Sequence, residues 1–129
     1  MKKKGLVLLS VSVVLLVIIC LRVVERDGFA ITVENNTEQS ISGLVIAYPS
    51  QTLVLAPIPK QSDVSKHIQT RNDFAEGEIN LVYKDKSGLE HKETIFGYIE
   101  KGYHGSATLK INGINNKGEL AIAVKAEVN

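Results

Sequence analysis

The 129-residue chain has no tryptophan, one cysteine, three prolines and only 5% aromatic residues. A single cysteine excludes an internal disulfide framework and a cysteine-based zinc site. The formal net charge is only +1, which excludes a strongly basic nucleic-acid-binding protein. No sequence motif that carries chemistry is present, so we expect no catalytic residue, no cofactor and no metal ligand set.

The one long hydrophobic run lies at the start of the chain. Residues 5–21 carry no charge and follow three lysines at positions 2–4. With the valines at 23 and 24 the run approaches the ~30 Å thickness of a bilayer core, since a helix rises about 1.5 Å per residue. We therefore expect a basic cytoplasmic tip at residues 1–4, a transmembrane anchor at 5–24 and a short linker at 25–28. The excess of positive charge before the run favours a single-pass cell-membrane protein with a cytoplasmic N-terminus and an extracytoplasmic C-terminal domain.

Two other interpretations of this segment stay open. A cleaved signal peptide has a shorter apolar stretch of about 7–15 residues and a small-x-small cleavage site. The small-x-small triplet available here, Gly28-Phe29-Ala30, follows a charged cluster and belongs to the first expected strand. A lipoprotein would use Cys20, but the bulky Val17, Ile18 and Ile19 before it fit poorly. The pattern favours the uncleaved anchor over a secreted or lipoprotein-like accessory protein.

After the anchor the hydrophobic pattern changes to the two-residue period of β-strands. Turn residues separate short alternating segments, and no helical period is present. All three prolines fall between residues 49 and 59, which places that stretch at a sheet edge or at a crossing between sheets. We expect an all-β domain over residues 29–129, built as an immunoglobulin-like antiparallel β-sandwich of seven or eight strands. The expected strands are 29–34, 41–48, 53–56, 64–69, 78–84, 90–99, 106–112 and 119–128.

The residue types that could carry chemistry lack the required spacing. His67, His91 and His104 have no partner histidine three or four residues away, so they do not form a zinc motif, and we expect His91 and His104 to be solvated. The serine after His104-Gly105 lacks the flanking glycine of a nucleophile elbow. The acidic residues from Asp63 to Glu78 do not have EF-hand spacing and predict a solvated loop.

Two local patterns point to a surface role. Asn35-Asn36-Thr37 matches an N-glycosylation acceptor, and it equally suits a turn in which the asparagine caps nearby backbone. A second pattern combines flexible backbone with flat amphipathic side chains. It predicts either a loop that binds a protein, peptide or glycan, or a tight corner whose tyrosines pack on the core. Its residues are Gly97, Tyr98, Gly102, Tyr103 and His104.

Three stretches together, 31–37, 81–88 and 97–103, resemble small membrane-anchored β-domain proteins of Gram-positive bacteria. The resemblance implies an envelope protein and supplies no catalytic residues. Residues 27–129 contain ten Lys and Arg against thirteen Asp and Glu, a net charge of −3, which disfavours binding to nucleic acid. The function expected is therefore a membrane-tethered extracytoplasmic module that binds a protein or peptide near the bilayer. The alternative is an envelope hydrolase, which would need a nucleophile and a base brought together by the fold.

Overall fold

The structure is a computed structural model that describes residues 11–17, 28–70 and 75–129. Residues 11–17 are helical. Within the described ranges no helix is long and apolar enough to cross a membrane. Most of the expected anchor at 5–24 lies outside these ranges, as do residues 25–27 of the expected linker. Gly28, the last residue assigned to the linker, instead opens the first strand.

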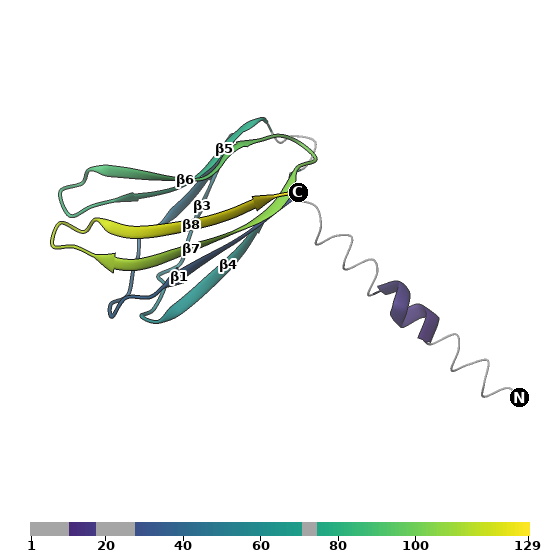
Figure 1. The fold of residues 1–129 in the computed structure, drawn as a ribbon, viewed down its shortest axis with the longest axis horizontal. Coiled ribbons are helices and arrows are strands. Elements are labelled where there is room, and N and C mark those ends of the chain that lie inside the picture. Colours follow the sequence, from purple (N-terminus) through teal and green to yellow (C-terminus); the bar gives the residue numbers. More distant parts are fainter. Residues whose placement is uncertain (1–10, 18–27, 71–74) are drawn as a thin grey trace, which may run out of the picture.

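The rest of the described chain is a two-layer β-sandwich, as the sequence predicts (Figure 1). One sheet has the strand order β4-β1-β7-β8 and the other the order β3-β2-β5-β6. The strands are β1 (Gly28–Asn35), β2 (Val45–Tyr48), β3 (Gln51–Val54), β4 (Ser62–Ile68), β5 (Gly77–Lys84), β6 (Glu90–Ile99), β7 (His104–Ile114) and β8 (Leu120–Val128).

The expectation of a wholly antiparallel sandwich is wrong at one pairing. β1 lies between β4, which runs antiparallel to it, and β7, which runs parallel to it from Gly28↔His104 to Asn35↔Ile111. Parallel neighbours need a long connection. Here the connection is residues 36–103, which contain β4 and the whole second sheet. The alternation of apolar residues within β1 or β7 therefore does not predict this parallel pairing.

The hydrophobic core lies between the sheets, where alternate residues of the central strands point inward. β1, β5 and β7 bury the faces that their sequence alternation predicts. Loop residues on either side of β2 and β3 close the core. The largest fully buried apolar side chains are Phe29, Ile31, Val33, Leu44, Ile46, Ile58, Ile79, Leu81, Ile99, Leu109 and Ile111. Phe29 and Phe96 join the sheets, with ring centroids 4.6 Å apart.

The proline-rich stretch lies where the sequence places it, although the strand bounds shift. β3 is a four-residue edge strand, and the chain from Pro57 to Pro59 crosses from its sheet to β4 in the other. The expected strand at 41–48 begins only at Val45. Ile41 before it forms an isolated bridge with Ile58. The expected strand at 53–56 is instead Gln51–Val54, because β3 pairs with β2 through a tight turn after Tyr48.

β8 differs most from its sequence pattern. Its alternation predicts five inward apolar residues, but Leu120, Ile122 and Val124 are only partly buried and Ala126 and Val128 are exposed. β8 is an edge strand, and its inward side chains become more exposed toward its C-terminal end, where Val128 is 48% exposed. The regular pattern thus marks a face that the described residues leave partly open.

The sandwich has two distinct ends. At one end, named here the entry end, lie Gly28, Ile68, Ile99, His104 and Val128. At the opposite end, the far end, two hairpin turns have the same hydrogen bonds. Asp85 Oδ1 accepts from the backbone of residues 87 and 89, and Asn115 Oδ1 accepts from the backbone of 117 and 119.

The closing residue of each far-end turn is the glycine that the sequence predicts. Gly88 and Gly118 have φ of 84° and 81°, a region that favours glycine. The two turns contact each other, since Lys86 N donates to Lys117 O at 2.9 Å.

Candidate functional site

The glycine–tyrosine segment lies at the entry end, in the connection from β6 to β7. Gly97 and Tyr98 stand in an irregular part of β6, because two register shifts separate Gly77↔Ile99 from Asn80↔Thr94. Such bulges redirect side chains. Tyr98 consequently points outward and is 54% exposed. Gly102 closes the turn with φ of 89°, and His104, expected in a turn, is the first residue of β7.

Two tyrosine rings and two carboxylates meet at this point, named here the tyrosine corner: Tyr98, Tyr103, Glu76 and Glu100. The rings of Tyr98 and Tyr103 meet edge to face at 79°, with centroids 6.3 Å apart. The Tyr98 hydroxyl lies 3.0 Å from Oε2 of Glu76 and 3.2 Å from Oε2 of Glu100. Tyr103 is half-buried against the core. The segment thus combines both interpretations: the ring of Tyr103 packs on the core, as in a tight corner, and the exposed ring of Tyr98 can contact a ligand, as in a binding loop.

The carboxylates determine the charge of the corner. Hydrogen bonding of its phenol to Glu76 and then to Glu100 raises the pKa of Tyr98 to about 12. The same Glu100 carboxylate raises the pKa of Tyr103. A phenol has one proton to donate, so most acceptor positions of the two carboxylates remain open. The tyrosine corner is therefore an acidic, aromatic surface suited to a cationic group.

The shifted ionisation of Tyr98 is measurable, because four tyrosines and no tryptophan dominate the near-ultraviolet absorbance. We expect a tyrosinate component near pH 12 that Tyr98→Phe removes and Glu76→Gln moves toward the usual value of about 10. Since the folded pKa is the higher one, this contribution to stability is complete below pH ~10 and is lost as the pH rises through about 12.

The matched control for this titration is Tyr48→Phe, which removes a tyrosine whose hydroxyl donates to Gln51. The component near pH 12 should remain in this variant while circular dichroism reports a folded chain. A component near pH 12 that keeps its full amplitude in Tyr98→Phe would contradict the assignment.

At the far end, Asp85, Ser87 and His91 come together in one hairpin. Asp85 Oδ1 accepts from Ser87 Oγ at 2.6 Å, and Asp85 Oδ2 lies 2.9 Å from His91 Nε2. These bonds, that from Ser87 first, hold the pKa of Asp85 well below its usual range. A serine hydrolase needs the histidine between the serine and the carboxylate. Here the carboxylate is in the middle, so the group caps a turn and does not activate the hydroxyl.

His91 was expected to be solvated and is instead half-buried. Its ring stacks on Tyr83 with centroids 5.0 Å apart, in addition to its bond to Asp85. His67 lies on the outer side of β4, opposite Ala30, and His104, which the sequence also predicts to be solvated, is half-buried at the entry end. The fold thus keeps the three histidines on separate parts of the sandwich.

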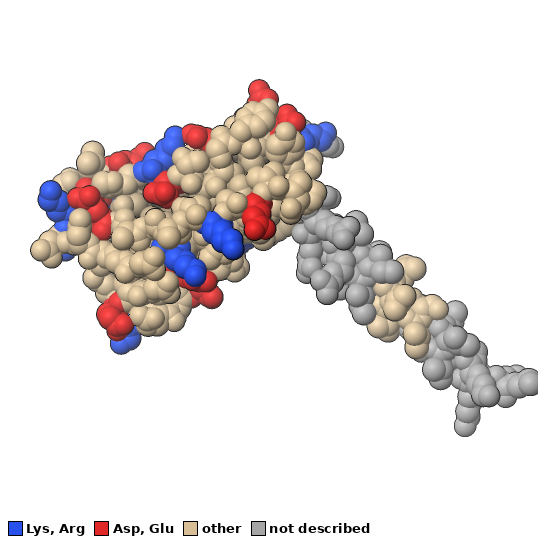
Figure 2. All heavy atoms as spheres, viewed as in Figure 1, with Lys and Arg blue, Asp and Glu red and all other residues tan. Residues whose placement is uncertain are grey.

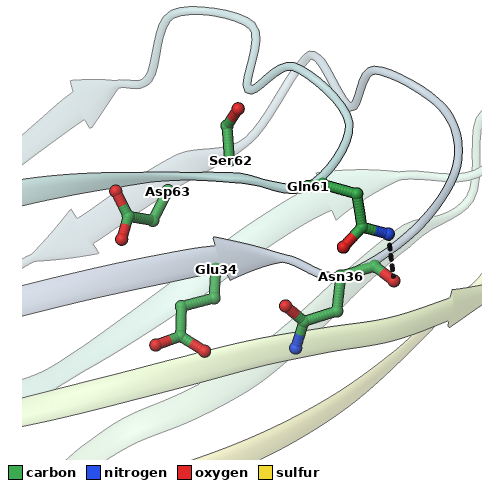
Figure 3. Close-up of a pocket in the computed structure, with 5 residues that line it drawn as sticks. All are labelled: Glu34, Asn36, Gln61, Ser62 and Asp63. Atoms are coloured by element: carbon green, nitrogen blue, oxygen red, sulfur yellow. Dashed lines mark hydrogen bonds between the residues drawn. The ribbon is translucent and has the colours of Figure 1, made fainter.

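A shallow polar hollow of about 450 Å³ lies beside the β1–β4 edge, lined by Glu34, Asn36, Gln61, Ser62 and Asp63 (Figure 3). Glu34 and Asp63 are cross-strand partners, and Gln61 Nε2 donates to Asn36 O at 3.2 Å. Like charges placed opposite each other on a sheet are unfavourable. Lys110 of β7 is the other register neighbour of Glu34 and offsets this repulsion.

The acidic residues from Asp63 to Glu78 do not converge. Asp63 lines the hollow, Glu76 accepts from Tyr98, and Glu78 forms an ion pair with Lys92, while Asp73 lies outside the described residues. In the part of the chain that the structure describes, no group of three or more His, Cys, Asp or Glu residues is placed to hold a metal ion. Basic and acidic side chains alternate over the face of the sandwich that Figure 2 shows.

Asn35, the residue of the glycosylation pattern, is fully buried at the end of β1. Its Nδ2 donates to the carbonyl oxygens of Gln39, Ile58 and Pro59 at 2.9, 3.0 and 3.1 Å. Its Oδ1 accepts from the Thr37 backbone at 3.0 Å and from the Thr37 hydroxyl at 2.7 Å. A glycan on Nδ2 would displace these carbonyls, so the pattern serves the fold as the turn interpretation anticipates.

Comparisons with known proteins add little to this site. Neither protein-family models nor curated protein sequences match the chain. Among solved structures, an "NMR structure of the protein from Eubacterium rectale" has a TM-score of 0.46 and 8% sequence identity, and the similarity covers 76% of this chain and 88% of that one. Similarity at this level assigns neither a family nor a function.

Proposed function

We propose that the protein is a membrane-tethered extracytoplasmic interaction module that binds a basic protein or peptide segment close to the bilayer. The observation that carries the proposal is the tyrosine corner. An exposed tyrosine is held beside a second ring by two carboxylates, on a domain of net charge −3. Exposed tyrosines are typical anchors of interaction surfaces, and aromatic rings with carboxylates attract lysine and arginine.

The tether follows from the position of the tyrosine corner. β1 begins at Gly28, at the same end of the sandwich as Tyr98 and Tyr103. Three residues separate the proposed anchor at 5–24 from Gly28, and these span at most about 10 Å when extended. The corner would then face the membrane and reach partners that lie near its surface. The basic N-terminus and the resemblance to anchored Gram-positive proteins support an extracytoplasmic location.

The immunoglobulin-like architecture is the finer part of the proposal. The sheet order β3-β2-β5-β6 matches the C′-C-F-G order of a variable-type domain, and the antiparallel pair β1–β4 matches strands B and E. β7 lies beside β1 and runs parallel to it, where an A strand would stand. The described residues would then form an immunoglobulin-like sandwich in which β7, the first strand of a C-terminal hairpin, takes the position of the A strand.

Location is tested first, on intact cells. A full-length chain with Cys20→Ser and Leu89→Cys carries one thiol at an exposed position of the far end. A membrane-impermeant maleimide should label it before lysis. Protection of this thiol until the cells are permeabilised would overturn the extracytoplasmic orientation.

Binding is tested with a photoreactive benzoylphenylalanine in place of Tyr98 in the full chain. The matched control places the same residue at Leu89, which is 62% exposed but lies at the far end. We expect a discrete adduct from position 98 that Glu76→Gln with Glu100→Gln reduces at least tenfold. Equal adducts from both positions, or an adduct indifferent to the two carboxylates, would contradict the proposal.

A further inference from the structure

The four edge strands of the sandwich differ in how they are protected against pairing with another strand. β3 has only four residues and is flanked by Pro49 and Pro57. β6 begins with Glu90, Lys92 and Glu93 and is bulged, and β4 carries the exposed Asp63, Lys66 and His67 along its seven residues. Short length, prolines, charges and bulges are the usual protections of a sheet edge. β8 has nine residues, no proline, and Lys125 and Glu127 as its only charged side chains.

Two hydrogen bonds show which residues of β8, the even-numbered or the odd-numbered ones, direct their backbone N–H and C=O groups away from β7. Leu120 N donates away from β7 to the Tyr83 hydroxyl at 3.0 Å, whereas Asn129 N donates toward β7 to His104 O at 2.8 Å. Because successive backbone groups of a strand alternate in direction, the even-numbered residues from 122 to 128 direct N–H and C=O outward. Among the described strands β8 pairs only with β7, so this edge has no strand partner there.

We infer that the open edge of β8, the backbone of residues 124–128, pairs antiparallel with the same edge of a second copy of this chain about a two-fold axis at Ala126. A two-fold axis at an even residue sets outward-facing groups opposite one another, as hydrogen-bonded pairs require. Ala126 then faces its own copy, and Val124 faces Val128 of the second copy.

The side chains select this register. With the axis at Ala126, Lys125 of each chain lies opposite Glu127 of the other, an oppositely charged cross-strand pair formed twice. Moving the axis to Lys125 would set two lysines opposite each other. Moving it to Val124 would set Lys125 opposite Ala123 and would need the N–H of Leu120, which Tyr83 already holds.

Burial supports the same register. Along β8 the even-numbered side chains change from partly buried at Val124 to exposed at Ala126, with Val128 48% exposed. Pairing at Ala126 covers this apolar end with its own copy and joins the two β4-β1-β7-β8 sheets into one. Gly28 lies two strands from β8 at nearly the level of Val128, so both chains would leave the dimer near its axis, along opposite strand directions.

The test uses thiol crosslinking of the full-length chain in isolated membranes, with Cys20→Ser as background and a short bis-maleimide. Ala126→Cys places two thiols at the axis. Ala121→Cys, exposed on the same strand but beyond the overlap, is the matched control. We expect the covalent dimer to form at least tenfold faster with Ala126→Cys. Equal rates would overturn the inference.

Charge reversal tests the register itself. In the Ala126→Cys background, Lys125→Glu or Glu127→Lys alone turns both cross-strand attractions into repulsions and should lower the dimer yield about tenfold. The double reversal restores opposite charges and should recover the yield. A yield that is unaffected by the single changes, or not recovered by the double change, would overturn pairing at Ala126. Neither residue belongs to the tyrosine corner, so these outcomes are separable from those of the binding test.

Discussion

Asn35→Asp is expected to lower the free energy of unfolding by about 3–5 kcal/mol at pH 7, a large part of the 5–15 kcal/mol of an ordinary domain. The substitution changes a single amide nitrogen to oxygen and leaves the shape of the side chain nearly unchanged. Its effect is therefore electrostatic. The loss arises because Nδ2 of Asn35 faces three carbonyl oxygens in a site with no exposure to solvent.

The geometry around Asn35 leaves a carboxylate no favourable orientation. One side of the amide receives two hydrogen bonds from Thr37, and the other donates to the carbonyls of the crossing segment that contains Ile58. An aspartate oxygen in place of Nδ2 would set negative charge against carbonyl oxygens and leave them unsatisfied, which costs more than the loss of one hydrogen bond. The variant should open first where β1 meets the crossing segment.

The pH dependence of this variant has a definite sign. Burial among acceptors raises the pKa of the new carboxyl in the folded state above its unfolded value of about 3.9. The penalty is then smallest below pH ~4, increases as the pH rises from there, and is complete above the folded pKa. Urea unfolding at several pH values measures it. The matched control is Asn36→Asp, because Asn36 is exposed and its side-chain amide donates to Oδ1 of the exposed Asn112. A change of no more than about 1 kcal/mol is expected there, and an equal loss in both variants would contradict the role assigned to Asn35.

Local sequence was sufficient for the elements that bury one face. In β1 and β5 the alternation of apolar residues predicts which side chains lie inside, and Phe29, Ile31, Ile79 and Leu81 are all buried. The glycine turns were predictable for a similar reason. The alternation of a strand and the glycine at a positive φ both depend only on residues close together in the chain, so the local sequence predicts them.

The features that sequence could not reveal depend on distant residues. The nearby Thr37 makes a turn at Asn35 predictable. The side-chain amide of Asn35 also donates to the carbonyl oxygens of Ile58 and Pro59, and no sequence spacing predicts these two bonds. Tyr98 lies in a sequence that resembles an ordinary strand end, yet the register shifts against β5 turn it outward. The partial burial of β8 goes with its position at the edge of the sheet, and the hydrophobic pattern of β8 itself does not indicate that position.

Gly105→Ala is expected to lower the free energy of unfolding by about 3 kcal/mol, whereas Gly97→Ala should raise it by about 0.5 kcal/mol. A Cβ on Gly105 would lie 2.1 Å from the backbone oxygen of Glu127 and 3.1 Å from Cα of Val128. These are backbone atoms of the neighbouring strand, so the clash is relieved only by moving β8. At Gly97 a Cβ would meet nothing within 4 Å.

The two substitutions therefore distinguish the cost of a clash with the backbone of β8 from the gain of restricting a flexible glycine in the unfolded chain. Both glycines lie in strands near the entry end, and the same methyl group is added to each. Urea unfolding should shift the midpoint in opposite directions with an unchanged slope, since neither change alters the surface exposed on unfolding. Displacing β8 at Val128 would also displace the edge that we infer to pair with a second copy, so Gly105→Ala should slow dimer formation in the Ala126→Cys background. An unchanged midpoint for Gly105→Ala would mean that the end of β8 separates from β7 at no cost, and the paired edge could not then be a rigid extension of the sheet.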